Sequence, residues 1–160
     1  MNLTVDIQCA SKEPVPEEDD IRGWIDAALH TAPPAGHCEI SVRLVDREEM
    51  SELNASFRGK QGPTNVLSFP ASLPEGVISP LLGDIVVCAP VVREEALQQG
   101  KTLDAHWAHM MIHGTLHLLG YDHVEDSDAV TMEALESAIL KQLDFACPYL
   151  DDQARTLPTQ

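Results

Sequence analysis

Alternation of apolar and polar residues marks the strand-like segments of the chain. Residues 3–9 (LTVDIQC) and 39–45 (EISVRLV) place an apolar side chain at every second position, which is the period of a strand with one buried face. Residues 64–69 (TNVLSF) are expected to form a short strand that ends at Pro70. Residues 81–88 (LLGDIVVC) are apolar almost throughout, as expected for a strand buried on both faces. We therefore predict four strands.

Apolar residues recur at helical spacing in five further segments. The predicted helices cover residues 17–31, 47–57, 91–99, 103–119 and 128–144. The fourth segment differs from the others, because LDAHWAHMMIHGTLHLL consists almost only of apolar residues and histidines. A helix that is apolar on all sides is a buried one, so this segment is expected at the centre of the protein.

Two of these helices carry more detailed predictions. Asp46 is expected to cap the start of the second helix, with Glu49 three residues later completing the capping box. Phe57 is expected on the buried face of the same helix. The last helix is expected to turn these side chains inward: Val130, Leu135, Ile139 and Leu143.

The order of the segments predicts the fold class. Strands and helices do not alternate strictly along the chain, which favours an α+β fold over a regular α/β fold. We expect one compact domain over residues 1–150, with a four-stranded mixed sheet packed by about five helices. The buried central helix carries the histidines discussed below. Residues 151–160 show no periodic pattern and are expected to form a flexible tail.

The charge of the chain limits the partners that it can attract. Ten basic residues stand against 26 acidic ones, so the net charge is −16. Such a protein repels bare nucleic acid at long range, since binding to phosphates is normally driven by Lys and Arg. The acidic runs themselves are expected to form a solvated face.

Other features of the composition point to the cytoplasm. No apolar run has transmembrane length, and the N-terminus does not read as a secretory signal. The four cysteines are far apart and form no C-x-x-C pair, so reduced thiols are expected. We predict a cytoplasmic protein with no membrane partner.

Three histidines stand at the spacing of metal ligands in HGTLHLLGYDH, residues 113–123. His113 and His117 lie one helical turn apart and share a helix face. Gly120 can end the helix in a left-handed turn and bring His123 back to the same ion. Three nitrogen ligands and an open fourth position are typical of catalytic zinc. The spacing is that of the metzincin proteases, but Gly114 occupies the position of their glutamate base.

Further side chains are candidates for the same site. His109 lies one turn before His113 and suits a partner of the ligands, a catalytic group or a core histidine bonded to a carbonyl. Asp84 and Asp122 are candidates for the missing base, and Asp122 equally suits the orientation of the turn.

Two cations are candidates for binding a substrate anion. Arg58 and Lys60 lie in a glycine-rich segment, FRGKQGP. The planar fork of an arginine matches two oxygens of a phosphate, although a surface salt bridge explains Arg58 equally well.

Three sequence blocks resemble the signature blocks of the YbeY family of bacterial rRNA maturation factors: FRGKQGPTNVLSFP, LLGDIVVCAP and HWAHMMIHGTLHLLGYDH. The resemblance implies a zinc-dependent, single-strand-specific endoribonuclease that acts in 16S rRNA 3′-end maturation and ribosome quality control. It implies one Zn²⁺ held by His113, His117 and His123, with Arg58 and His113 as catalytic residues. The implied partners are single-stranded RNA, the 16S rRNA precursor and the ribosome or its proteins.

The residues by themselves leave two other classes open. One is a metal-dependent hydrolase of a peptide or small molecule, which a carboxylate beside the metal would favour. The other is a ribosome assembly factor with a structural metal, which a closed fourth ligand would favour. In the RNase reading, a basic cleft around Zn²⁺, Arg58 and Lys60 is expected within an otherwise acidic surface. The general base is then Asp84, His109 or the 2′-OH of the substrate.

Overall fold

A computed structural model of the chain describes residues 3–30, 37–71, 76, 79–121 and 126–145. Within these residues it contains four strands and five helices, as predicted. Their order along the chain is β1 (Leu3–Cys9), α1 (Glu18–Leu29), β2 (Cys38–Val45), α2 (Arg47–Arg58), β3 (Val66–Pro70), β4 (Leu81–Cys88), α3 (Ala89–Gln99), α4 (Leu103–Leu118) and α5 (Asp126–Gln142).

The four strands form one mixed sheet in the order β1-β2-β4-β3. β1, β2 and β4 run parallel, and β3 runs antiparallel to β4. The helices α1 and α2 lie in the connections that parallel strands require. The prediction of a mixed four-stranded sheet is therefore confirmed, and β3 lies at one edge of it.

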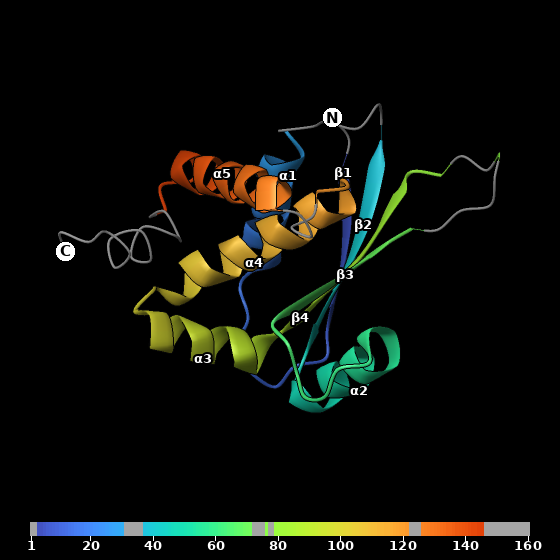
Figure 1. The fold of residues 1–160 in the computed structure, drawn as a ribbon, viewed down its shortest axis with the longest axis vertical. Coiled ribbons are helices and arrows are strands. Elements are labelled where there is room, and N and C mark those ends of the chain that lie inside the picture. Colours follow the sequence, from blue (N-terminus) through green and yellow to red (C-terminus); the bar gives the residue numbers. More distant parts are fainter. Residues whose placement is uncertain (1–2, 31–36, 72–75, 77–78, 122–125, 146–160) are drawn as a thin grey trace.

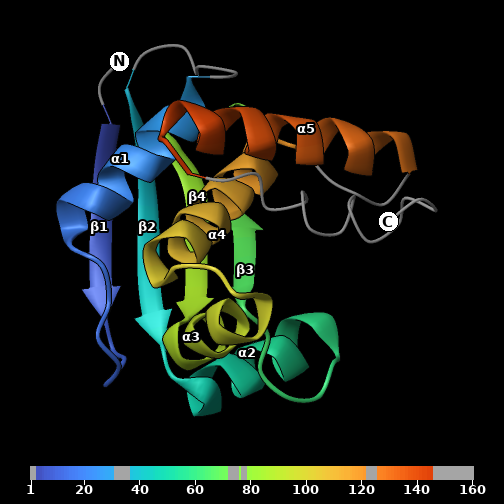
Figure 2. The same cartoon turned by 90° about the vertical axis from the view of Figure 1, so that its left-hand side faces the viewer.

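The helices cover the two faces of the sheet unequally. Figure 1 shows α1, α4 and α5 on one face and α2 on the other. In Figure 2, α4 crosses in front of β4 while α1 lies over β1 and β2. The central position predicted for the apolar helix is confirmed, because α4 packs against α1, α3, α5, β3 and β4.

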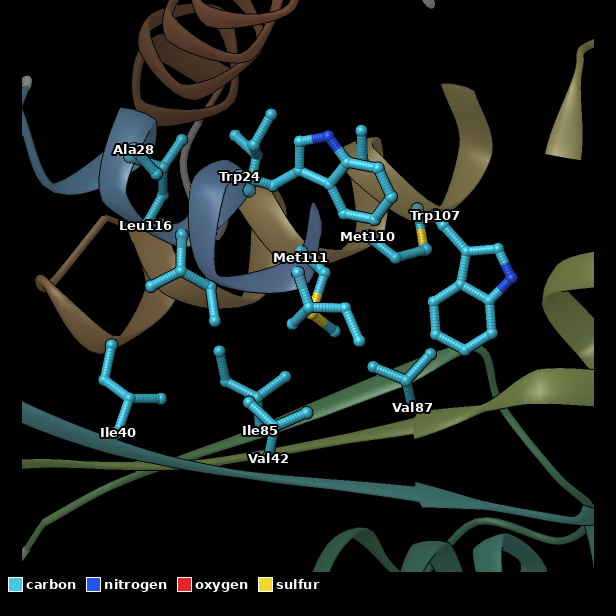
Figure 3. Close-up of a cluster of buried hydrophobic side chains, with 14 of the residues drawn as sticks. Trp24, Ala28, Ile40, Val42, Ile85, Val87, Trp107, Met110, Met111 and Leu116 are labelled. Carbon is cyan, nitrogen blue, oxygen red and sulfur yellow. The ribbon is translucent and has the colours of Figure 1, made fainter. Parts of the chain in front are cut away.

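The main core lies between α4, α1 and the sheet. Figure 3 shows aromatic, methionine and leucine side chains of the two helices packed over branched side chains of β2 and β4. A smaller cluster on the opposite face joins α2 to the sheet. Successive residues of β4 therefore point into different cores, with Ile85 and Val87 in the first and Val86 and Cys88 in the second. This confirms that β4 is buried on both faces.

The predicted cap of α2 is correct in position but not in its hydrogen bonds. Asp46 precedes the helix, yet its side chain does not cap it. The carboxylate instead accepts hydrogen bonds from the Ser11 hydroxyl and the Lys12 backbone N–H, and these bonds lower the pKa of Asp46. Glu49 pairs with Arg43 on β2 at 2.9 Å. Tertiary partners have replaced the local capping box.

Two of the predicted inward side chains are exposed. Phe57 is 65% exposed and packs edge-on against Phe69, with ring centroids 5.1 Å apart. Val130 is 66% exposed, because the buried stripe of α5 follows Met132, Glu136 and Ile139 instead. The acidic Glu136 belongs to that buried stripe, which the apolar pattern alone did not include.

Some predictions concern residues beyond the described part of the chain. The boundary near residue 150 and the expected tail belong to this group, as does Cys147. The other three cysteines, Cys9, Cys38 and Cys88, are free thiols. None of the described helices combines the length and apolar character needed to cross a bilayer.

Candidate active site

Helix α4 positions the two central histidines. Its start is capped by the Thr102 hydroxyl, which accepts a hydrogen bond from the Ala105 N–H. Most of the helix is buried, whereas His113 and His117 remain half-buried. They lie one turn apart on one face, as the spacing predicted, and their Nε2 atoms are 3.1 Å apart.

This separation fits two ligands of one metal ion. Zinc–imidazole bonds of 2.0–2.1 Å in a tetrahedral arrangement place the two nitrogen atoms about 3.3 Å apart. The Nε2 atoms of His113 and His117 are close to that separation. The third predicted ligand, His123, and the neighbouring Asp122 lie outside the described residues. Within the described residues, no group of three metal-binding side chains occurs.

Glu136 of α5 fixes the orientation of His113. One carboxylate oxygen accepts a hydrogen bond from Nδ1 of His113 at 2.8 Å, and the other accepts one from Nε2 of His109 at 3.0 Å. Since a carboxylate only accepts, Nδ1 of His113 must carry the hydrogen, and in a neutral imidazole Nε2 then carries the lone pair. Burial alone raises the pKa of Glu136, but the two histidine hydrogen bonds outweigh it and lower the pKa to about 2.

His109 belongs to the support of the site and does not line its cavity. Its ring is buried, which lowers its pKa against the opposing effect of Glu136. A neutral His109 donates to Glu136 through Nε2. The predicted role as a partner of the ligands therefore agrees with the geometry better than that of a base in contact with substrate.

A cavity of about 450 Å³ opens beside the two histidines, along the edge strand β3. Arg58, the last residue of α2, lies on its wall together with His113 and His117. The chain leaves α2 through Gly59 in a left-handed conformation, and the Asn54 side chain holds the next loop by donating to the Gly62 carbonyl at 2.9 Å. The other described lining residues are Thr64, Asn65, Val66, Leu67 and Ser68, none of them acidic.

Two predicted members of the site lie elsewhere. Asp84 is exposed and lines a different hollow, with Arg43 and Phe57, on the α2 face of the sheet. The strand alternation explains this, because its neighbour Ile85 points toward α4. Asp84 therefore lies apart from the described lining of the cavity, and its role as a base stays a prediction. Lys60 is exposed and is not among the described residues that line the cavity.

Gly114 occupies the protease-glutamate position for a steric reason. A Cβ atom at this position would lie 3.0 Å from the Ile85 Cγ2 atom and 3.2 Å from the Ser68 hydroxyl oxygen. The same hydroxyl donates a hydrogen bond to the Gly114 carbonyl at 3.0 Å. Helix α4 thus lies close to the sheet beside His113 and His117, and a side chain at position 114 would crowd Ile85 and Ser68.

The end of α4 is a glycine turn. Tyr121 N–H donates to the Leu116 carbonyl and Gly120 N–H donates to the His117 carbonyl, both at 3.0 Å. This pair of bonds defines a Schellman motif. Gly120 has a φ of 102°, so the turn that the sequence predicted after His117 is present.

Replacing Gly120 with valine is expected to weaken metal binding. A Cβ atom would meet open space, but the positive φ costs a residue with a side chain about 1–2 kcal/mol. If the turn relaxed to relieve this strain, the segment that leads to His123 would move, and the proposed third ligand would no longer reach the ion. Gly100→Val is the matched control, because Gly100 ends α3 with a φ of 67° and also faces open space. Both variants should lose stability, whereas zinc affinity by chelator competition should fall only for Gly120→Val; equal affinity would contradict the turn argument.

A second carboxylate holds the other wall of the cavity. Glu95 of α3 accepts a hydrogen bond from the buried His106 at 2.8 Å and another from the Asn65 amide at 3.1 Å. The side-chain oxygen Oδ1 of Asn65 in turn accepts from the Val66 N–H at 2.7 Å. This network fixes the start of β3. Our sequence reasoning missed both Glu95 and Glu136; an acid within the apolar stripe of a helix is the signal that identifies Glu136.

Known proteins resemble this chain over nearly its whole length. The profile of the family described as Endoribonuclease YbeY matches residues 6–144. Proteins named Endoribonuclease YbeY from Stutzerimonas stutzeri and Methylococcus capsulatus are each 52% identical, over 155 and 147 residues respectively. The first alignment covers 96% of both chains, and the second covers 92% of this chain and 95% of the relative.

The fold also matches a solved structure. The solution structure of TM1509 from Thermotoga maritima aligns with a TM-score of 0.58 at 26% sequence identity, covering 96% of this chain and 94% of that one. Sequence and fold thus agree with the three blocks that first suggested the relationship. The chain belongs to the Endoribonuclease YbeY family.

Proposed function

We propose that this protein is a metal-dependent endoribonuclease that cleaves single-stranded RNA in the cavity along β3. The observation that carries the proposal is the shared wall of that cavity, where Arg58 faces the same space as His113 and His117. Relatives that are about half identical to the chain carry the name endoribonuclease. We extend the proposal to 16S rRNA 3′-end maturation and ribosome quality control in the cytoplasm.

The histidines would hold the metal ion. His113 and His117 supply two Nε2 atoms at a separation suited to one ion, and His123 is the proposed third ligand. Zn²⁺ in this position would supply a Lewis acid for a phosphoryl oxygen or an attacking water. With Nδ1 of His113 donating to Glu136, its Nε2 lone pair would be available to such an ion.

Arg58 would bind the phosphate. Its guanidinium group offers a planar fork to two phosphate oxygens, and it would neutralise the charge that grows in the transition state. Phosphoryl transfer depends mainly on such positioning and electrostatics. A glutamate base at position 114 is therefore less necessary here than in a peptide hydrolase.

The lining of the cavity supports RNA as a substrate for a chain with a net charge of −16. Its described lining residues include one arginine and no acid, while most carboxylates lie elsewhere. A single local cation gives weak general affinity for nucleic acid. Delivery by the ribosome or one of its proteins would raise the local concentration of the RNA, and such a partner is part of the proposal.

The alternative of a peptide hydrolase has little support in the described part of the site. That chemistry needs a carboxylate beside the metal as base, and the described lining residues contain none. Glu136 points its oxygens at two histidines, behind the ligands. The 2′-OH of the RNA or a water molecule remains as the attacking group.

Replacing Arg58 tests the proposal directly. Arg58→Ala is expected to lower cleavage of a single-stranded RNA oligonucleotide by roughly 100-fold, the typical loss when one donor to transition-state charge is removed. Arg58→Lys should restore activity only in part, since it keeps the charge but not the fork. Zinc content should stay unchanged in both.

The matched control is Arg22→Ala, which removes an exposed arginine from α1, outside the cavity lining. It should cleave as the wild type does. Equal cleavage by Arg58→Ala and Arg22→Ala would remove Arg58 from the site, and loss of zinc from Arg58→Ala would make its role structural.

A further inference from the structure

Glu136 connects two helices at the back of the candidate metal site. It extends from α5, 23 residues along the chain from His113 on α4. Its side chain is 1% exposed. A carboxylate in such a place is costly unless it is hydrogen-bonded, and here each of its oxygens accepts an N–H from a different histidine of α4.

The geometry of these bonds determines which nitrogen atom of His113 can bind a metal. Nδ1 lies 2.8 Å from Glu136 and Nε2 lies 3.1 Å from Nε2 of His117. An imidazole that donates through Nδ1 presents its lone pair at Nε2. Metal-binding histidines commonly donate their other nitrogen to a carboxylate, which fixes the tautomer and the ring orientation.

His109 holds the carboxylate from the other side. Its ring is buried, one turn before His113, and donates to the second oxygen of Glu136 at 3.0 Å. Both oxygens of the carboxylate thus accept a hydrogen bond, and it cannot rotate away from His113 without breaking a buried one. Such a break would leave a buried carboxylate oxygen without its donor, which is unfavourable.

We infer that Glu136 is a positioning residue that presets His113 for metal binding by fixing its Nδ1–H tautomer, with His109 as the clamp of the carboxylate. The inference rests on the proposed metal site. It adds α5 to that site, although no residue of α5 is among the described residues that line the cavity.

The test compares Glu136→Gln with Glu133→Gln. Glutamine has one acceptor oxygen and one donating amide nitrogen, so it cannot accept from both histidines. Glu133 lies on the same helix and is only partly buried, and it undergoes the same chemical change. Two readouts are needed: the tautomer of His113 by ¹⁵N NMR on metal-free protein, and zinc affinity by competition with a chelator.

We expect His113 to show a single Nδ1–H tautomer in the wild type and in Glu133→Gln. Glu136→Gln should show a tautomer mixture at His113 and a 10- to 100-fold loss of zinc affinity, the usual effect of losing such a partner. Glu136→Asp keeps the charge but shortens the side chain. Its zinc affinity should lie between those of the wild type and Glu136→Gln. It also provides the same readouts if Glu136→Gln does not fold.

Unchanged tautomers and zinc affinity within about twofold of wild type, in whichever Glu136 variant folds, would overturn the inference, since a partner of this kind normally contributes at least tenfold. A purely structural role would lower the melting temperature and leave the His113 tautomer of the folded protein as it was. If the wild type bound no zinc, the proposed function would fail, while the NMR readout would still decide the role of Glu136.

Discussion

The variant His117→Ala is expected to lose both its metal ion and its RNA cleavage. Only His113 would then remain of the histidine pair whose Nε2 atoms are 3.1 Å apart. Metal catalysis contributes several kcal/mol to transition-state stabilisation, and about 3 kcal/mol corresponds to a loss of about 100-fold in rate. We therefore expect cleavage of single-stranded RNA to fall at least 100-fold. Zinc content by elemental analysis should fall in the same preparation.

His30→Ala is the control for this variant. His30 is exposed at the end of α1, where its ring bonds the Asp26 carbonyl, and it should keep both metal and activity. If His117→Ala retained one zinc ion per chain, the predicted ligand set would be wrong. If it lost zinc but cleaved RNA normally, the metal would be structural and the assembly-factor class would gain support.

Gly83→Ala is expected to produce the largest loss of stability. Gly83 lies in β4 with a φ of 149°, opposite Pro70 of β3. An added Cβ atom would lie 2.3 Å from the Phe69 carbonyl oxygen, 2.9 Å from the Pro70 Cα atom and 2.8 Å from a methyl group of Leu118. Two of these three atoms are backbone and cannot rotate aside.

The substitution would therefore push β3 away from β4 and disturb α4 next to His117. Overpacking together with an unfavourable φ should lower the free energy of unfolding by about 3 kcal/mol or more. For a chain of this size that is a fall in melting temperature of roughly 10 °C, which calorimetry can measure.

Gly23→Ala is the matched control for Gly83→Ala. Gly23 is an exposed glycine inside α1, where an added Cβ atom would meet nothing within 4 Å. Alanine should stabilise the helix there by about 0.5–1 kcal/mol. If the melting temperature of Gly83→Ala equalled or exceeded that of the wild type, the prediction would be wrong, and β3 and β4 could move apart without a loss of stability.

The fold was largely predictable because its elements carry local patterns. The period of two marked β1 and β2, a continuous apolar run marked β4, and the buried helix was evident from an apolar sequence on all sides. The errors occurred where tertiary contacts replaced a local rule. Asp46 bonds Ser11 and Lys12 instead of its own helix. Phe57 packs on Phe69 at the surface instead of entering the core.

Only some residues of the candidate site were predictable from the sequence. The spacing of four residues brings His113 and His117 together, since one helical turn fixes their separation whatever surrounds the helix. Arg58 was suggested by its phosphate-binding chemistry and by family resemblance, and the structure places it on the same cavity wall. Zinc, His123 and the catalytic roles stay predictions.

The sequence by itself determined the elements, the family and the pair of histidines, because each depends on residues close together along the chain or on the blocks as a whole. Only the tertiary structure decided that Glu136 lies behind His113, that Asp84 faces a different hollow, and that a side chain at Gly114 would crowd Ile85 and Ser68. The physical reason is that these contacts depend on how α5, β4 and α4 pack together. A change of one residue in register would turn a different side chain toward the site.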